Sequence, residues 1–193
     1  AIYRSLVGSE MCIRDRQKGY AVAKVLACGS GLTIQHVKAG RITVNYPRII
    51  GHEIIGEIVE INGHGGDLKI GTPVTAFFYL TCGHCRWCNI DRETLCDNFR
   101  GYIGREIDGG YAEYIKLPIE NFIKIPEEID YKNNLLETAV VCDAVATPLK
   151  VIKKARISSF DKVGVIGAGG GLGIHMLKML KLNNISAIGI DTK

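Results

Sequence analysis

The chain has 193 residues, of which 47% are apolar and 23% are charged, and its formal net charge is +4. These values are ordinary for a globular protein of one domain or one and a half. Because the basic residues form no blocks and no apolar run reaches the length of a membrane span, we expect neither nucleic-acid nor membrane partners.

The first residues resemble a cloning artefact. Residues 6–16 read LVGSEMCIRDR, which looks like a transposase sequencing adaptor translated in one reading frame. We therefore exclude residues 1–16 from the fold prediction, the alternative being a genuine but unusual N-terminus. On this interpretation Cys12 has no role, and the protein proper starts near Gln17, in mid-domain.

Short apolar runs rich in β-branched residues predict strands in the following part of the chain. The predicted strands are residues 21–28, 54–61, 74–80 and 111–117. The last of them follows Gly109-Gly110 and is succeeded by a loop-rich passage between Pro118 and Pro126. The first part of the chain is therefore expected to be β-rich.

A different pattern begins near residue 133. Residues 133–154 predict helix with an interruption near Pro148, because proline lacks the amide hydrogen that a helix interior needs. Residues 161–166 predict a buried strand, 174–182 a helix and 186–190 a second buried strand. This β-turn-α-β order is the opening unit of a doubly wound α/β sheet.

Four cysteines form the densest chemical motif. Cys82, Cys85, Cys88 and Cys96 lie in the run CGHCRWCNIDRETLC. Short steps between thiols let one stretch of backbone surround one metal, and four thiolates close the tetrahedral shell of a structural zinc. An iron–sulfur centre is the alternative, but the seven residues before Cys96 and the absence of a following proline argue against it. A nucleic-acid-binding zinc ribbon would need two well-separated cysteine pairs.

The cysteine count also bears on the compartment. The chain has 7 cysteines, an odd number with most of them in one cluster. Metal ligation in a reducing cytosol accounts for this pattern better than a disulfide framework. We therefore expect a cytoplasmic protein.

A glycine-rich turn joins the first strand of the α/β unit to its helix. Glycine permits the tight turn and lets backbone N–H groups approach a pyrophosphate at the helix N-terminus. Asp191 follows the second strand, where a carboxylate would bind the ribose hydroxyls and repel a 2′-phosphate, so NAD is favoured over NADP. The predicted cofactor-binding residues are Gly167, Gly169, Gly170, Gly171, Leu172, Gly173 and Asp191.

A second metal site is suggested by the run GHEIIG. His52 and Glu53 lie at the start of a predicted strand, and Cys142 offers a further thiol outside the lobe. A lone histidine or a buried free cysteine more often has no such role. The combination with a zinc lobe favours a catalytic metal.

Taken together, these motifs resemble the medium-chain zinc-dependent alcohol dehydrogenases. The resemblance runs from residue 17 to 193 and rests on PRIIGHE at 47–53, the four-cysteine lobe, GGYAEY at 109–114 and the glycine turn. It implies a GroES-like catalytic domain at residues 17–155 with its zinc lobe at 80–100. It also implies the start of a Rossmann NAD-binding domain at 156–193.

The resemblance further implies roles for particular residues. The four lobe cysteines match structural zinc ligands. His52 matches the catalytic-zinc histidine, Glu53 the neighbouring acid and Cys142 a further catalytic-zinc ligand. Thr33 matches the hydroxyl beside the substrate oxygen, and His36 matches the histidine that relays protons to solvent.

One position departs from the family pattern. Gly31 stands where the first catalytic-zinc cysteine belongs, which leaves His52, Cys142 and Glu53 as donors. Three protein ligands plus water remain a known zinc arrangement. Alternatively the glycine is a sequencing error, since one base separates common Cys and Gly codons. A remodelled loop that brings in Cys28 is a third alternative.

The implied function is hydride transfer between an alcohol, or its carbonyl, and NAD, with zinc as Lewis acid. The alternative is a zinc-independent reductase of the enoyl or quinone type that keeps only the structural zinc. The implied partner is a small-molecule substrate, and the full-length protein is expected to be a homodimer or homotetramer. Because a dinucleotide fold has about six strands, we expect this piece alone to be inactive.

Overall fold

The computed structural model describes residues 18–192, so the predicted adaptor segment lies outside the described residues. The chain divides into two compact units, the first ending at Ala139 and the second beginning at Val140. Each unit has its own apolar core. None of the helices in residues 18–192 is long and apolar enough to cross a membrane.

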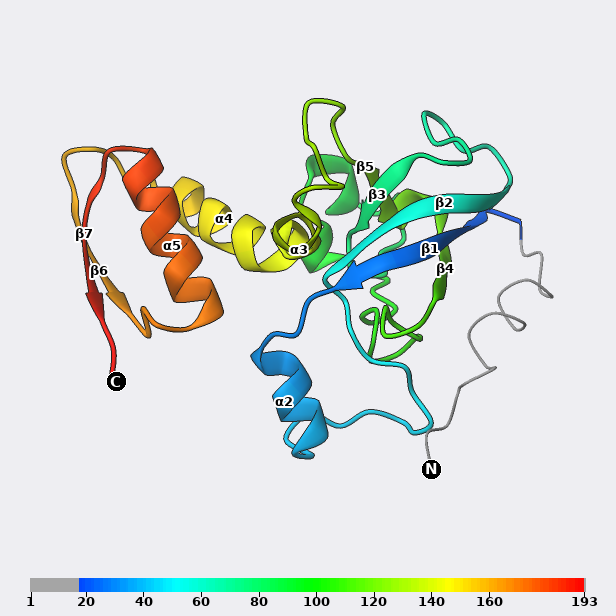
Figure 1. Cartoon of the computed structure of the whole chain (residues 1–193), viewed down its shortest axis with the longest axis horizontal. Coiled ribbons are helices and arrows are strands. Elements are labelled where there is room, and N and C mark those ends of the chain that lie inside the picture. Colours follow the sequence, from blue (N-terminus) through cyan, green and yellow to red (C-terminus); the bar gives the residue numbers. More distant parts are fainter. Residues whose placement is uncertain (1–17, 193) are drawn as a thin grey trace. The chain divides into compact units, whose positions relative to one another are not determined.

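The first unit is built on a five-stranded antiparallel sheet with the order β4-β1-β2-β3-β5. Figure 1 shows β1 and β2 as the long central pair, with β4 beside β1. The strands are β1 (Tyr20–Cys28), β2 (Ile54–Asn62), β3 (Pro73–Ala76), β4 (Tyr114–Pro118) and β5 (Phe122–Lys124).

The first half of strand β2 is buried on both faces, which accounts for the isoleucines there. Successive side chains of a strand point to opposite faces. Ile54 and Ile58 accordingly pack into the main core, whereas Ile55 joins a second cluster with Ile125 and Ala139 of α3 (Leu135–Ala139). The strand that begins beside His52 and Glu53 is therefore fixed by packing on two sides.

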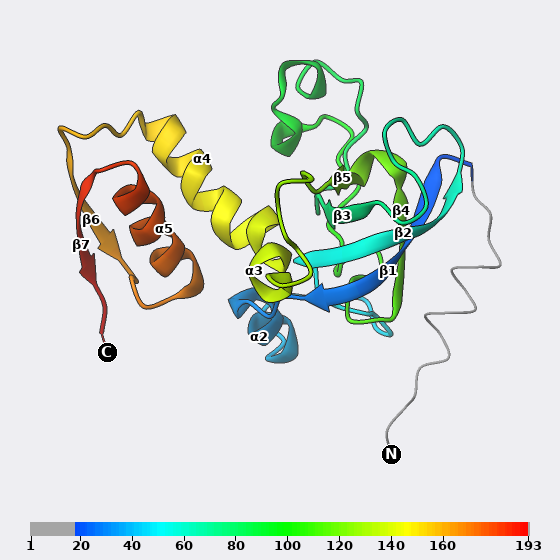
Figure 2. The ribbon, with the colours of Figure 1, turned by 45° about the horizontal axis from the view of Figure 1, so that its top comes forward.

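Two segments outside the sheet bear on the candidate sites. Helix α2 (Leu32–Lys38) follows β1, and Ile34 and Val37 form its buried face. The cysteine lobe contains two short 3₁₀ helices, η1 (Cys88–Ile90) and η2 (Glu93–Leu95), and Figure 2 shows it in green beyond the sheet. A further 3₁₀ helix, η3 (Ile119–Asn121), joins β4 to β5.

The second unit begins with a π-helical turn, η4 (Val141–Val145), followed by helix α4 (Ala146–Ala155). Strands β6 (Lys162–Ile166) and β7 (Ser186–Ile190) pair in parallel, and helix α5 (Gly171–Leu182) connects them. Both views show α5 along the strand pair. Side chains of α4, α5 and β6 share one core, with Ile152, Leu180 and Val165 among its members.

The expected fold class is confirmed: a β-rich unit precedes a β-α-β unit. The helix predicted over 133–154 is divided into α3, η4 and α4. The break falls before Pro148, which lies in the first turn of α4, where its missing amide hydrogen is no loss. The predicted boundary between residues 155 and 156 coincides with the end of α4, and it stays a prediction.

Several elements differ from the expectations. Strand β3 ends at Ala76 rather than at residue 80, although Tyr79 bridges to Tyr102 further on. Strand β5 lies inside the passage expected to be loop, and α2 lies in a stretch treated as loop. The cause is length: strands and helices of so few residues carry too little periodicity to be read from sequence.

The strands of the second unit are less buried than predicted. Val165 of β6 is buried, but Ile166 is 86% exposed and Ile188 of β7 is 70% exposed. Doubly wound sheets have helices on both faces. Among residues 140–192, α4 and α5 pack with Val165 in one core, and alternate residues such as Ile166 point to the opposite face.

Candidate functional site

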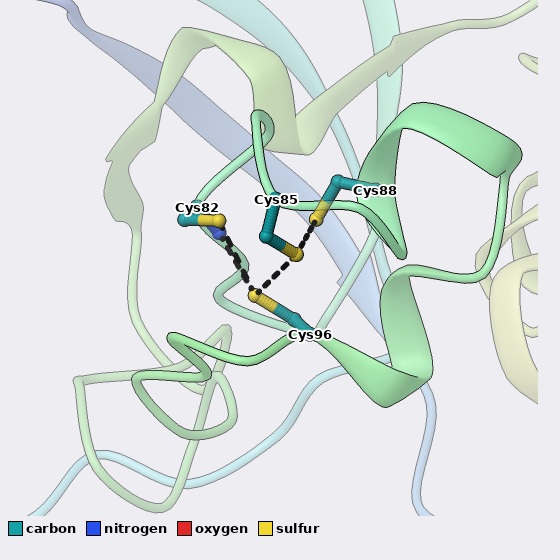
Figure 3. A group of neighbouring side chains, drawn as sticks. All are labelled: Cys82, Cys85, Cys88 and Cys96. Carbon is teal, nitrogen blue, oxygen red and sulfur yellow. Dashed lines mark hydrogen bonds between the residues drawn. The ribbon is translucent and has the colours of Figure 1, made fainter.

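The four lobe cysteines point their sulfur atoms at one another (Figure 3). The Sγ–Sγ distances are 3.5 Å for Cys85–Cys88, 3.9 Å for Cys85–Cys96 and 3.5 Å for Cys96–Cys82. A tetrahedral zinc with Zn–S bonds of about 2.3 Å separates its sulfur ligands by roughly 3.8 Å. The donor set therefore fits zinc.

The backbone of the lobe is arranged to stabilise thiolates. The amide of Cys82 donates to Sγ of Cys96 at 3.3 Å. A hydrogen bond from the backbone of His84 is the main cause that lowers the pKa of Cys82 to about 6. Burial, followed by the side-chain hydrogen bond with Cys85, raises the pKa of Cys88 to about 11. A metal cation would hold all four sulfurs in the thiolate form.

Asp97, the residue after Cys96, contacts two residues in the first half of the lobe. Its carboxylate accepts a hydrogen bond from Nε1 of Trp87 at 3.1 Å and pairs with Nε of Arg86 at 3.4 Å. The Arg86 guanidinium also lies over the Trp87 ring, 4.9 Å from its centroid. These contacts join the first half of the lobe to the second. No sequence motif marks Asp97 as a residue that stabilises the lobe.

The second candidate metal site involves the start of β2. Glu53 is 5% exposed, and the His52 ring lies 4.9 Å from the ring of Phe78. At Gly31 the backbone is extended, and a Cβ placed there would lie 3.8 Å from Oε2 of Glu53. The structure thus brings position 31 to Glu53, but glycine offers no donor there.

Whether the chain can hold a catalytic zinc depends on how many ligand side chains lie close together. Within residues 18–192, the lobe cysteines are the only group of three or more histidine, cysteine or acidic side chains with ligand atoms within 4.8 Å of one another. The first unit supplies His52 and Glu53, whereas a catalytic zinc has three protein ligands. Cys142 belongs to the second unit, in η4, and is described with that unit. The first unit by itself is therefore one donor short.

Cys28 has a packing role. Its Sγ lies 2.7 Å from the position that a Cβ on Gly51 would take and 3.0 Å from that of a Cβ on Gly110. It packs against the main core of the first unit. Its thiol therefore fills the space left by two glycines.

Thr33 and His36 lie three residues apart on α2 and therefore share one face of the helix. Both are half-buried. Nη1 of Arg41 lies 3.3 Å from Nδ1 of His36. Because arginine only donates hydrogen bonds, Nδ1 accepts and the proton of the neutral ring lies on Nε2.

A loop contact missed by sequence reasoning supports the same region. Oδ1 of Asp108 accepts hydrogen bonds from Nη1 of Arg48 at 2.9 Å and from the amide of Ile49 at 3.1 Å. The hydroxyl of Tyr111 donates to the carbonyl of Gly29 at 3.2 Å. Asp108 and the adjoining GGYAEY segment thus tie together the stretches before β2 and after β1. No local pattern marks a pairing across such a sequence distance.

The glycine turn of the second unit has two positions that demand glycine. Gly167 has φ +76°, in the left-handed region. A Cβ on Gly173 would overlap the carbonyl oxygen of Gly167 and lie 2.7 Å from Cα of Ala168. Gly171, by contrast, has open space around its Cβ position. Helix α5 therefore begins in close contact with the preceding turn.

Asp191 lies where the sequence predicted a ribose-binding acid. Its Oδ2 accepts a hydrogen bond from the amide of Gly169 at 2.7 Å, and its Oδ1 accepts one from the amide of Thr192 at 2.7 Å. The acid and the glycine turn are thus in direct contact. The remaining predicted residues of the turn, Gly170 and Leu172, flank Gly171 at the start of α5.

Comparison with known proteins agrees with this architecture. Residues 17–127 match the family model of the alcohol dehydrogenase GroES-like domain. An alcohol dehydrogenase of Geobacillus stearothermophilus is 33% identical over 179 residues, covering 91% of this chain and 51% of that protein. An acryloyl-coenzyme A reductase of Sulfurisphaera tokodaii is 32% identical over 151 residues, covering 77% of this chain and 43% of that protein.

Among solved structures, a cobalt- and zinc-bound thermostable alcohol dehydrogenase from Pyrobaculum aerophilum superposes with a TM-score of 0.81 at 30% identity. The match covers 91% of this chain and 52% of that chain. The chain thus spans about half the length of the relatives it matches. Because the family model covers more than half of the chain, the chain belongs to the medium-chain zinc-dependent alcohol dehydrogenase family.

Proposed function

We propose that this chain, within its full-length protein, transfers hydride between an alcohol, or its carbonyl, and NAD. The observation that carries the proposal is the Asp191 carboxylate held at the glycine turn by the amide of Gly169. A carboxylate at this place receives the ribose hydroxyls of NAD and repels the additional phosphate of NADP. NAD supplies the hydride acceptor, and the chain positions it.

The proton chemistry is assigned to the first unit. We propose that Thr33 contacts the substrate oxygen and that His36 carries the proton onward, since both lie on one face of α2. The Arg41 hydrogen bond to Nδ1 leaves Nε2 of His36 to exchange protons. His52, beside the aromatic ring of Phe78, is proposed at the reacting end of the site.

Two versions of this function differ in their zinc content. In the zinc-dependent version, the residues that the family resemblance assigns to a second zinc, His52, Glu53 and Cys142, would hold it, and it would act as a Lewis acid. In the alternative, the protein keeps only the lobe zinc and acts as a reductase of the enoyl or quinone type. Gly31 favours the alternative, because it places no donor beside Glu53.

The substrate class, the assembly and the compartment are proposed on the same basis. We propose small-molecule alcohols or carbonyls as substrates, a homodimer or homotetramer as the full-length assembly, and the cytoplasm as the compartment. The cysteines support this compartment, because the lobe thiols can bind metal only when they are reduced.

The proposal is tested by enzyme assays of the full-length protein in which the absorbance of NADH is followed. A panel of primary alcohols, polyols and enoyl thioesters, offered with NAD or NADH, should yield at least one substrate. Substitution of His52 by alanine should abolish turnover of that substrate. Unchanged turnover in the His52→Ala enzyme would contradict the assigned site, and inactivity towards the whole panel would contradict the function.

A further inference from the structure

Position 31 has room for a side chain directed at Glu53. Gly31 precedes α2 with φ −82° and ψ −178°, extended backbone that any residue adopts. A Cβ built there would lie 3.8 Å from Oε2 of Glu53, an ordinary van der Waals distance, and among described residues other than its chain neighbours no other heavy atom falls within 4 Å. The Cβ of a cysteine therefore fits at this position without strain, beside a carboxylate.

The surroundings hold position 31 in place. The amide of Gly29 donates to the backbone carbonyl of Glu53 at 2.7 Å, and the hydroxyl of Tyr111 donates to the carbonyl of Gly29. Helix α2 begins one residue after Gly31 and is anchored by the buried Ile34. The distance between position 31 and Glu53 is thus set by backbone pairing and helix packing, not by a metal.

A side chain at position 31 would complete a donor set. His52 and Glu53 are consecutive residues that offer an imidazole and a carboxylate, and a thiolate beside Glu53 would add the third protein ligand that a catalytic zinc needs. The sulfur of Cys28 packs against Gly51 and Gly110.

We infer that this chain binds a single zinc ion, in its cysteine lobe, and that the glycine at position 31 is what keeps the first unit from holding a second. Gly31→Cys creates that second site. The inference rests on the proposed function only in treating His52 and Glu53 as metal donors.

Zinc content per chain is the direct test. The 193-residue chain, purified without added chelator, is analysed by elemental mass spectrometry beside three variants. The unaltered chain should carry one zinc and Gly31→Cys two. Gly31→Ser, which has the same shape but a poor zinc ligand, and Ser30→Cys, which adds a thiol one residue away, should each carry one.

Two further measurements establish which side chains bind the second zinc. Adding His52→Ala to Gly31→Cys should return the count to one. After a chelator has removed the more weakly held second zinc, added cobalt should produce thiolate-to-metal charge-transfer absorption in Gly31→Cys and not in the unaltered chain. The inference is overturned by two zinc ions in the unaltered chain, by a second zinc in Ser30→Cys, or by one zinc in a Gly31→Cys protein with an unchanged unfolding temperature.

The outcome is separable from that of the proposed function. Metal content involves neither NAD nor substrate, so counts of one and two uphold the inference even if the full-length protein oxidises no alcohol. Conversely, an active dehydrogenase with two zinc ions in its unaltered form overturns the inference and leaves the function standing.

Discussion

The carboxylate of Asp191 accepts a hydrogen bond from the backbone amide of Gly169, with 2.7 Å between the two atoms. Its other oxygen accepts from the amide of Thr192, so both oxygens are oriented by the backbone. The acid at the end of β7 and the turn after β6 are therefore in direct contact, although 22 positions separate the two residues.

Substitution of Asp191 should change the cofactor preference of the full-length protein. Asp191→Ser removes the negative charge and the ribose acceptor, so the ratio of KM values for NADP and NAD should fall about 10–100-fold, the equivalent of a charged hydrogen bond. Steady-state kinetics with both cofactors measures this. Asp161→Ser, which changes an exposed acid before β6, is the matched control, and an unchanged ratio in Asp191→Ser would contradict the role.

Two glycines of the turn should respond in opposite directions. Gly173→Ala forces a methyl group against the backbone of Gly167 and Ala168, which should cost at least about 1–3 kcal/mol of unfolding free energy. Gly171→Ala has open space in α5 and should be neutral or stabilise by about 0.5–1 kcal/mol. Thermal unfolding of the chain distinguishes the two, and equal effects would exclude the close approach at Gly173 as the cause.

The lobe should hold its metal less tightly when one ligand is removed. Cys85→Ser leaves three thiolates, so a chelator that leaves the zinc in the unaltered chain should strip it from the variant, and the lobe should become more sensitive to proteases. Elemental analysis and limited proteolysis give the two readouts. Cys142→Ser, which removes a thiol outside the lobe, is the control and should retain the zinc. Loss of zinc from this variant as well would show that the four cysteines are not what binds it.

The contact between Tyr131 and Glu57 should appear in the pH dependence of stability. The Tyr131 hydroxyl donates to Oε1 of Glu57 at 2.6 Å, and this hydrogen bond, followed by burial, raises the pKa of Tyr131 from 10.0 to about 12. Because the folded-state pKa is raised, the contribution is complete below pH 10 and is lost as the pH rises through 12.

Tyr131→Phe should therefore lower the unfolding free energy by about 1–2 kcal/mol at neutral pH, and its difference from the unaltered chain should shrink between pH 10 and 12. Chemical denaturation at several pH values measures this. Tyr46→Phe, at a position that is 69% exposed, provides the control. A difference that stays constant to pH 12 would contradict the contact as the origin of the effect.

Local sequence determined the parts of this protein whose chemistry lies within a short stretch. The four thiols converge because steps of a few residues confine them to one loop, and the expected zinc geometry is present. The β-α-β unit was predicted for a similar reason: its strands and helix each carry their own periodicity, and the glycine turn marks the junction.

Tertiary structure decided what depends on residues that are distant in sequence. The place of β5 beside β3, the contact of Asp108 with Arg48, and the approach of position 31 to Glu53 all arise from strand pairing and packing. A residue's type and spacing report local conformation, whereas which surfaces meet depends on the whole core. The sequence showed that Gly31 lacks a donor, and the structure shows that the space for one is present.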